Sequence, residues 1–392
     1  MLRRDLRELF AELPDPRVQR TRRHRLTDIL LLVLMGTILG CEGWDGIVLW
    51  AEEWEPELRT ILTLPSGIPS ADTIRRVMSA LDAREFGKVF ISWTQALCES
   101  MAGKLVSIDG KTVRGSFEGA SGEGALHLVN AWVSENAMVL GQYATDVKSN
   151  EITAIPELLK LLDLRGSTVS IDAMGCQKGI AKQIVEKDAD YIFGLKGNQP
   201  TLHEEVKTSF DEATCTALRK EPENYCETAD KGHGRNELRR VYVQRDVSWL
   251  MHSENWPKLS ALILVESERT RRGQTSVERR AYISSSRASA HVLAEQVRGH
   301  WHVENRLHWT LDVVYGEDRA RISRKNGAEN MSIVRKIAMN LLRSAPTRDG
   351  KPKSAPMKRI RANARFANLL QVLSAGGTKD ALEPRRRARR AE

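Results

Sequence analysis

The sequence predicts an α/β protein with a mixed sheet, preceded by a helical N-terminal domain. Helical periodicity fills the first hundred residues, whereas short β-branched segments begin at residue 105 and then alternate with amphipathic helices. A polar, charge-rich stretch at residues 200–285 interrupts this alternation and holds further strand-like segments, so we expect a β-rich insertion there. The chain has 392 residues, of which 41% are hydrophobic, and it can therefore bury a large core.

The N-terminal domain is expected at residues 1–102. Apolar spacing predicts helices at residues 28–39, 44–53, 73–81 and 82–101. The third of these helices exposes Arg75 and Arg76 and follows a loop rich in Gly and Pro. A helix, a turn and a short helix with two arginines is typical of helix-turn-helix DNA readers, so both arginines are candidate DNA contacts. The alternative is a helical bundle with a solvated basic face.

The second domain is expected at residues 103–343. Strands are predicted at residues 105–108, 125–133, 138–144, 168–171 and 191–195, with helices at 153–162 and 177–187. The first three strands can form an antiparallel meander, and helical crossovers then add two parallel strands. This succession is that of a ribonuclease-H-like mixed sheet. Beyond the insertion, the spacing predicts helices at residues 291–311 and 330–343.

Two aspartates directly follow apolar strands of this sheet. Asp109 comes after the first strand and Asp172 after the fourth. Because these two strands are neighbours in the predicted fold, the carboxylates meet at one edge of the sheet, where they repel unless a cation lies between them. Oxygen-only ligands favour Mg²⁺ or Mn²⁺ over zinc. The alternative is that each aspartate only caps the turn that follows it.

A third acid is needed for a site with two metal ions. Glu304 lies in a predicted helix, with His300 and His308 on the same helical face. A structural ion pair with a nearby arginine is the alternative, and spacing alone does not exclude three further acids downstream, which are Asp312, Glu317 and Asp318. The order H-E-x-x-H is absent, so the histidines are not expected to hold zinc.

The charge of the chain is concentrated at its two ends. The formal net charge is +9, but residues 1–26 carry +4 and residues 343–392 carry +10, which leaves −5 for the body between them. We therefore expect a basic C-terminal tail at residues 344–392 and a nucleic-acid partner. Five cysteines without a C-x-x-C pair fit the reducing cytoplasm. The longest apolar run, residues 29–41, is shorter than the roughly 20 residues of a membrane span, so no membrane contact is expected.

Short motifs in order along nearly the whole chain resemble those of insertion-sequence transposases of the DDE type, most closely the H-repeat-associated group. Individually most of these motifs are weak, and their common order is the signal. The matching segments include DPR at 15–17, SIDGK at 107–111, KSNE at 148–151, IDAMGCQ at 171–177, LKGNQ at 195–199, GHGR at 232–235, WHVEN at 301–305 and GED at 316–318.

The resemblance implies a helical DNA-binding region, a ribonuclease-H-like catalytic core and catalytic, metal-binding acids at Asp109, Asp172 and Glu304. In related families a Tyr and an Arg precede the third acid; Val297 and His300 stand at these positions here, and Arg298 or His300 is the expected substitute. It also implies two Mg²⁺ or Mn²⁺ ions, double-stranded DNA as the partner and a homodimer assembled on DNA. The remaining candidates for phosphate contacts are Lys111, Arg114, Lys196 and Arg235.

The expected function is hydrolysis of a phosphodiester at the ends of a mobile element, followed by strand transfer into target DNA in the bacterial cytoplasm. Metal ions held by the three acids would activate the attacking oxygen and stabilise the leaving oxygen. Two alternatives remain open. One is a ribonuclease-H-like nuclease that cuts DNA without joining it, and the other is a DNA-binding regulator whose catalytic core is silent.

Overall fold

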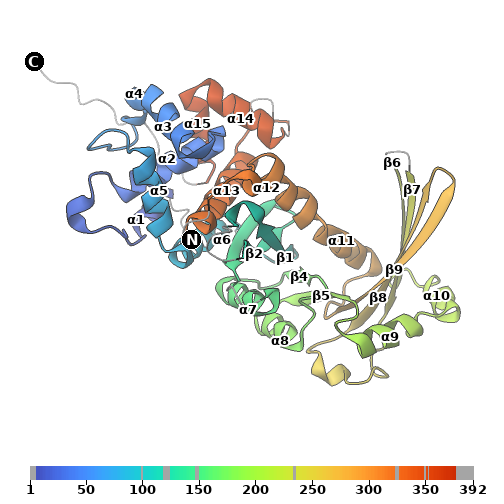
Figure 1. Cartoon of the computed structure of the whole chain (residues 1–392). Coiled ribbons are helices and arrows are strands. Elements are labelled where there is room, and N and C mark those ends of the chain that lie inside the picture. The colour runs from blue at the N-terminus through green and yellow to red at the C-terminus, as the bar shows by residue number, and fades with distance from the viewer. Residues whose placement is uncertain are drawn as a thin grey trace, which may run out of the picture.

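The computed structural model places one nine-stranded sheet between two groups of helices (Figure 1). It describes residues 6–98, 100–117, 124–145, 150–232, 235–322, 326–347, 350–351 and 353–376. Among these residues no single helix is long and apolar enough to cross a membrane. Two consecutive helices pass that test only when taken together, and they are bent at 98° to each other.

The sheet has the strand order β3-β2-β1-β4-β5-β9-β8-β7-β6. Its first five strands along the chain are β1 (Leu105–Val113), β2 (Leu126–Val133), β3 (Met138–Ala144), β4 (Thr168–Ile171) and β5 (Asp190–Leu195). The first three strands form an antiparallel meander, and β4 and β5 lie parallel to β1. This order and these directions confirm the predicted ribonuclease-H-like sheet.

Helices cover both faces of the sheet. The crossovers α7 (Glu151–Leu161) and α8 (Lys178–Glu186) share a core on one face with Ile108, Val129 and other strand residues. On the other face lie α11 (Ala290–His300) and α13 (Gly327–Ser344), which contact β1 and β3 respectively. Each strand of the central sheet is therefore buried on both sides, as its continuous apolar sequence requires.

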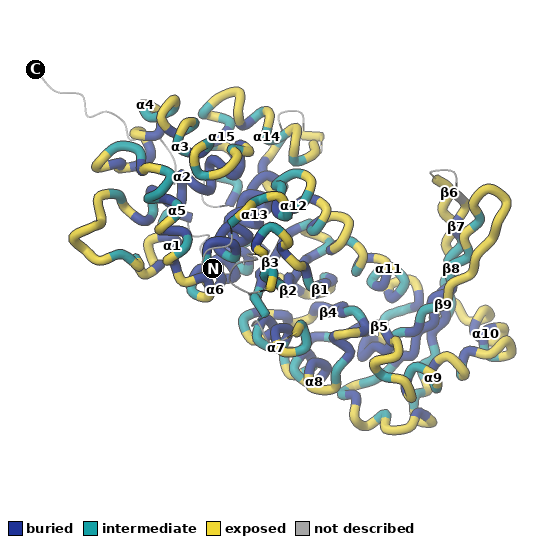
Figure 2. Tube along the Cα trace, viewed as in Figure 1, coloured by how far each residue is buried: buried dark blue, intermediate teal, exposed yellow. Residues whose placement is uncertain are grey.

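The predicted β-rich insertion continues the central sheet. It begins with α9 (Pro200–Ser209) and α10 (Glu212–Leu218), and its strands are β6 (Tyr225–Gly232), β7 (Arg235–Gln244), β8 (Ala261–Arg271) and β9 (Gln274–Ser284). All four strands are antiparallel to their neighbours, and β9 pairs with β5. The far ends of these long strands project from the body of the molecule and are exposed (Figure 2).

The helices at the two ends of the chain share a core. The N-terminal helices are α1 (Leu6–Ala11), α2 (Leu26–Leu39), α3 (Gly43–Glu53), α4 (Glu55–Leu58), α5 (Ala71–Ala80) and α6 (Ala83–Leu97). Their apolar side chains pack with those of α13, α14 (Ala355–Ala364) and α15 (Phe366–Ser374) in one cluster. In Figure 1 the blue and red helices accordingly lie side by side.

The region predicted as a basic C-terminal tail is therefore partly folded. Sequence periodicity predicts one helix there, whereas the structure contains both α14 and α15. Basic side chains of α14 bind the carboxyl ends of other helices. Arg359 Nε donates to Ile38 O at the end of α2 (3.0 Å), and Lys358 Nζ donates to Ala345 O beyond α13 (2.7 Å). Cations at these positions stabilise the helix dipole and satisfy terminal carbonyl groups.

The predicted helix at residues 291–311 is wrong in one respect. The chain is continuous α-helix only as far as His300, and a π-helix, η4 (Val303–His308), precedes the short helix α12 (Trp309–Val313). The apolar spacing of the sequence does not distinguish an α-helix from a π-helix, because the wider turn of a π-helix shifts the following side chains by only one residue position. Such π-turns are frequent at functional sites.

Candidate active site

Asp109 lies within β1, whereas the sequence predicts that it follows a strand. The parallel ladder between β1 and β4 ends at the pair Ile108–Ile171, and β1 continues because β2 remains paired with it as far as Val113. Asp109 is thus the first residue of β1 beyond the ladder. Burial, followed by the charges of Glu151, Asp172 and Glu304, raises its pKa to about 8.

Asp172 follows β4 directly, as predicted, and so stands beside Asp109 at the same edge of the sheet. Its Oδ1 accepts hydrogen bonds from the backbone N–H groups of Met174 (3.0 Å) and Gly175 (3.3 Å). The alternative that Asp172 caps the turn after its strand therefore holds for Oδ1. Its other oxygen, Oδ2, accepts no hydrogen bond within the described part of the chain. Burial raises the pKa of Asp172, and the charge of Lys196 opposes that shift.

Glu304 lies in the π-helix η4, which contacts β1. Its side chain is exposed and makes no hydrogen bond or ion pair with any residue that the structure describes. Its charge nevertheless contributes to the raised pKa of Asp109. In the same helix His308 Nδ1 lies 3.7 Å from Asp109 Oδ2, but burial lowers the pKa of His308 to about 3, so this contact is not an ion pair at neutral pH.

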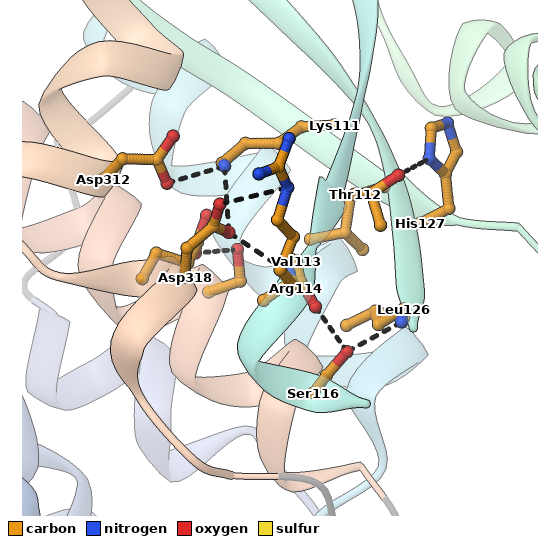
Figure 3. Close-up of polar contacts among 12 residues, drawn as sticks. Lys111, Thr112, Val113, Arg114, Ser116, Leu126, His127, Asp312 and Asp318 are labelled. Carbon is orange, nitrogen blue, oxygen red and sulfur yellow. Dashed lines mark hydrogen bonds and ion pairs between the residues drawn. The ribbon is translucent and has the colours of Figure 1, made fainter. Parts of the chain in front are cut away.

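The three rival acids are engaged elsewhere, and Figure 3 shows two of them, Asp312 and Asp318. Asp312 Oδ1 lies 2.7 Å from Lys111 Nζ, and Asp318 Oδ1 lies 3.4 Å from the same nitrogen. Glu317 is fully buried, where it accepts a hydrogen bond from Ser332 Oγ (2.8 Å) and faces Arg335. Lys111 itself, a predicted phosphate contact, is buried, so its charge is used within the protein.

Sequence reasoning missed two residues beside Asp109. Glu151, the first residue of α7, accepts a hydrogen bond at Oε1 from His127 Nε2 of β2 (2.8 Å). Both side chains lie over Gly110, where a Cβ atom would overlap the Glu151 carboxylate and come within 2.6 Å of His127 Nε2. The glycine after Asp109 was the available signal, because a strand residue without a side chain marks a close approach by another group.

The two arginines of the predicted helix-turn-helix lie on α5. Of Ser70 and Asp72, the two residues that the sequence offers as its cap, Ser70 caps this helix by accepting a hydrogen bond from Thr73 N. Arg75 and Arg76 both form ion pairs with Asp72, one turn earlier on the helix, and the side chain of Arg76 remains 77% exposed. Most of the Arg76 surface is thus accessible to solvent, whereas Arg75 is half-buried.

The other candidate contacts differ in their surroundings. Lys196 is exposed directly after β5, at the same edge of the sheet as Asp172. Arg114 is 84% exposed after β1, and its backbone N–H donates to Asp318. Arg298 of α11 pairs with Asp230 of β6 at 2.8 Å. Arg235 begins β7 opposite Gly232, and its side chain lies outside the described residues.

At Val297 and His300 the sequence departs from the Tyr and Arg of related families, and neither position presents a cation that could bind phosphate. Val297 is buried against the insertion strands, in a cluster with Val241 and Ile263. His300 is half-buried, and its Nδ1 lies 2.9 Å from Ser170 Oγ of β4. Of the two expected substitutes, Arg298 is therefore the accessible one.

The acidic residues fit a divalent cation by their chemistry. All the donors are carboxylate oxygens, which Mg²⁺ and Mn²⁺ prefer, and burial together with neighbouring negative charges raises the pKa of Asp109. Within the described ranges, no three His, Cys, Asp or Glu side chains are already arranged to hold one ion.

Comparisons with known proteins agree with these features. The family model described as "Transposase DDE domain" matches residues 101–341, and the model described as "DDE_Tnp_1-associated" matches residues 7–94. The "H repeat-associated putative transposase YhhI" of Escherichia coli (strain K12) is 37% identical over 377 residues, which cover 95% of this chain and 98% of that protein. The "Putative transposase YncI" of Escherichia coli O157:H7 is 41% identical over 342 residues, covering 86% and 87%.

A solved structure with a similar trace, a cryo-EM structure of the piggyBac transposase synaptic complex with hairpin DNA, has a TM-score of 0.41 and 12% identity over 96% of this chain and 77% of that one. The family matches and the H-repeat-associated relatives confirm the resemblance that the motifs indicate. This chain belongs to the family of transposases with a DDE domain.

Proposed function

We propose that this transposase cuts a phosphodiester bond at the ends of its own mobile element and joins the freed 3′-hydroxyl to target DNA, with two Mg²⁺ or Mn²⁺ ions as cofactors. The observation that carries the proposal is the position of Asp109 and Asp172 at adjacent points of two parallel strands, with the charge of Glu304 acting on Asp109. Acids gathered in this way at a sheet edge are suited to holding cations against a phosphate.

Asp109, Asp172 and Glu304 would hold the ions. When bound, divalent ions activate the attacking oxygen and stabilise the leaving oxygen of an in-line displacement. The role of the protein is to orient the carboxylates that would bind these ions. The backbone N–H groups of Met174 and Gly175 fix one oxygen of Asp172, and β2 holds the backbone of Asp109 in the sheet.

Glu304 is favoured as the third acid because its carboxylate is uncommitted. The carboxylates of Asp312 and Asp318 both pair with Lys111, and Glu317 is buried beside Arg335. Withdrawing Asp312, which lies nearest to Lys111, or Glu317 would weaken or remove the pairing of a buried cation, which is energetically costly.

For the DNA, Lys196, Arg114, Arg298, Arg235, Arg75 and Arg76 remain our candidate contacts. Lys196 is the best placed of them, since it is exposed and its charge already acts on Asp172. Lys111 is assigned instead to holding Asp312 of α12 and Asp318, which follows that helix. We further propose that the protein acts in the cytoplasm as a homodimer, so that two element ends are processed together.

The test is an assay of strand cleavage and joining on DNA that flanks the protein's own gene, with Mg²⁺. D109N, D172N and E304Q should each lower cleavage about a thousandfold or more, because several kcal/mol of transition-state stabilisation would be lost. DNA binding in a gel-shift assay should be retained. D163N is the matched control, because Asp163 is exposed and pairs only with the neighbouring Arg165.

Each alternative has its own outcome in this assay. Full cleavage by E304Q would move the third role to Asp312, Glu317 or Asp318. Cleaved ends without joined products would indicate a nuclease. Binding without cleavage, together with equal Mn²⁺ affinity of the wild type and the triple variant, would indicate a silent regulator.

A further inference from the structure

Asp15 and Arg17 hold each other in the loop between α1 and α2. Arg17 Nε donates to Asp15 Oδ1 (2.9 Å) and Arg17 Nη2 donates to Asp15 Oδ2 (2.8 Å), so the ion pair is made through two contacts. The backbone N–H of Arg17 also donates to Asp15 Oδ1 (3.0 Å). The two side chains are only 13% and 14% exposed. The DPR motif at 15–17 therefore fixes the start of this loop.

Further hydrogen bonds fix the rest of the loop. Arg17 Nη2 donates to His24 O (2.8 Å) and so connects the start of the loop with its end. Across the middle, Arg22 Nε donates to Arg17 O (2.9 Å). Ser66 Oγ donates to Arg23 O (3.0 Å), which attaches the loop to the segment that precedes α5. A loop held in this way is restricted to few conformations, so it loses little entropy when it binds a partner.

Other arginines of this loop take no part in these side-chain contacts. Residues 15–25 contain five arginines and one aspartate. Three of the arginines are exposed and make no side-chain hydrogen bond or ion pair with any residue that the structure describes; they are Arg20, Arg23 and Arg25. In Figure 2 the loop beside α1 projects from the helical domain and is mostly exposed. These arginines differ in this respect from Arg75 and Arg76 of α5, which both pair with Asp72.

We propose that this loop, in the conformation fixed by Asp15 and Arg17, is a contact surface for the phosphates of double-stranded DNA, and that Arg20, Arg23 and Arg25 bind them. The inference rests on the DNA partner of the proposed function and adds a surface that α5 does not supply. Guanidinium groups without an acidic partner bind phosphate oxygens readily. A solvated run of charges does not explain the loop equally well, because solubility needs no hydrogen bonds that hold it in one conformation.

The experiment is titration of a fluorescent duplex, taken from the DNA that flanks the protein's own gene, with the purified full-length protein. Anisotropy is measured without divalent ions, so that no strand is cut, and at several salt concentrations. R20Q/R23Q/R25Q should raise the Kd at least about tenfold and lower the slope of log K against log salt by about 2 to 3, because each phosphate contact contributes about 0.9. An unrelated duplex should lose affinity equally, since phosphate contacts carry no sequence information.

The control with matched charge is K182Q/K220Q/R287Q, which also removes three cations from exposed positions. It should bind both duplexes nearly as the wild type does, and the unfolding temperature should be unchanged in both triple variants. If the loop variant bound as the control variant does, the inference would be overturned and the loop arginines would serve solubility alone. A wild-type protein that bound neither duplex would instead refute the DNA partner of the proposed function.

D15A separates the fixed conformation of the loop from its charge. The substitution removes a negative charge, so charge alone predicts tighter binding to DNA. Loss of the contacts with Arg17 predicts weaker binding instead, by about threefold or more, because the loop must then be ordered on the DNA. Its unfolding temperature should stay close to that of the wild type, since the lost contacts are local to the loop. Unchanged or tighter binding by D15A would overturn the role of the fixed conformation.

Discussion

The imidazole of His300 connects α11, the helix before Glu304, to β4, the strand that directly precedes Asp172. His300 Nδ1 lies 2.9 Å from Ser170 Oγ, and Ser170 Oγ donates to Ser107 Oγ on β1 (3.1 Å). Burial lowers the pKa of His300 to about 4. The folded protein thus keeps this side chain neutral under conditions in which an unfolded chain would protonate it.

Stability should therefore fall as the pH falls from about 6.5 to 4. In this window the unfolded state binds a proton that the folded state does not bind, so the contribution of His300 is fully present above pH 6.5 and is lost towards pH 4, with a size of about 3 kcal/mol. Urea unfolding at pH 7.5, 5.5 and 4.5 measures it. H300Q should lose stability less steeply than the wild type.

The control for this series is H291Q, an exposed histidine of the same helix. It should follow the wild-type pH dependence. If H300Q and H291Q gave the same profile as the wild type, the acid sensitivity of the protein would have to come from carboxylates.

At the residue scale, the sequence predicts the two aspartates and leaves the third acid open. Asp109 and Asp172 can be located because an apolar strand precedes each one. Glu304 cannot be distinguished from Asp312 by spacing, because the difference lies in an ion pair with Lys111, 201 residues earlier in the chain. The same pairing explains why Lys111, two residues after Asp109, is buried and not free to bind phosphate.

At the element scale, the position of Glu304 depends on how α11 packs on the sheet. Gly299 lies against Leu105 at the start of β1, where a Cβ atom would come within 2.5 Å of Leu105 Cδ2. This close approach precedes the π-helix by one turn. It therefore sets the distance between the sheet edge and the segment that carries the third acid.

G299A should destabilise the protein by about 1–3 kcal/mol, because the added methyl group overpacks this contact. Cleavage activity should fall further than stability does, since α11 and Glu304 move away from Asp109 together. Adding L105A to G299A should restore part of both, because the clashing methyl group is removed. Chemical denaturation and the cleavage assay measure the two effects.

G87A is the matched control. Gly87 lies in the helix α6, and a Cβ atom there meets nothing within 4 Å. This substitution should raise stability by about 1 kcal/mol through helix propensity. Equal losses in G299A and G87A would show that glycine removal, and not the contact with Leu105, is responsible.

Helices and strands whose boundaries depend on nearby residues are predicted well from the sequence. Those whose boundaries depend on pairing with distant residues are not. The first strand is predicted to end at residue 108 because Asp and Gly follow, yet pairing with β2 carries it to Val113. The insertion strands are likewise longer than their apolar cores, since charged cross-strand pairs such as Arg269 with Glu237 extend them.

At the scale of the whole molecule, the basic charge has two separate uses. Lys358 and Arg359 stabilise helix ends within the protein. The final run of five arginines, at residues 385–390, lies outside the described residues. Of the +10 carried by residues 343–392, a share is thus engaged in the fold.

Deleting residues 384–392 should weaken DNA binding and flatten its dependence on salt without altering cleavage chemistry. Each phosphate contact contributes about 0.9 to the slope of log K against log salt, so the slope should fall by up to about 4. Binding measured between 50 and 200 mM salt tests this. An unchanged slope would mean that these arginines serve solubility alone, whereas replacing Arg359 should lower stability instead.

The core shared by both ends of the chain has a consequence for the order of synthesis. Nearly every residue of α2 is buried, and its partners α13 and α14 are made about three hundred residues later. Its contacts with α1 and α3 can form early, but during translation the surface of α2 that packs on α13 and α14 stays uncovered until those helices are made. If a copy of the gene ended before α13, its N-terminal helices would lack these partners and would not fold on their own. Such a fragment would therefore not compete with the full-length protein for the element ends.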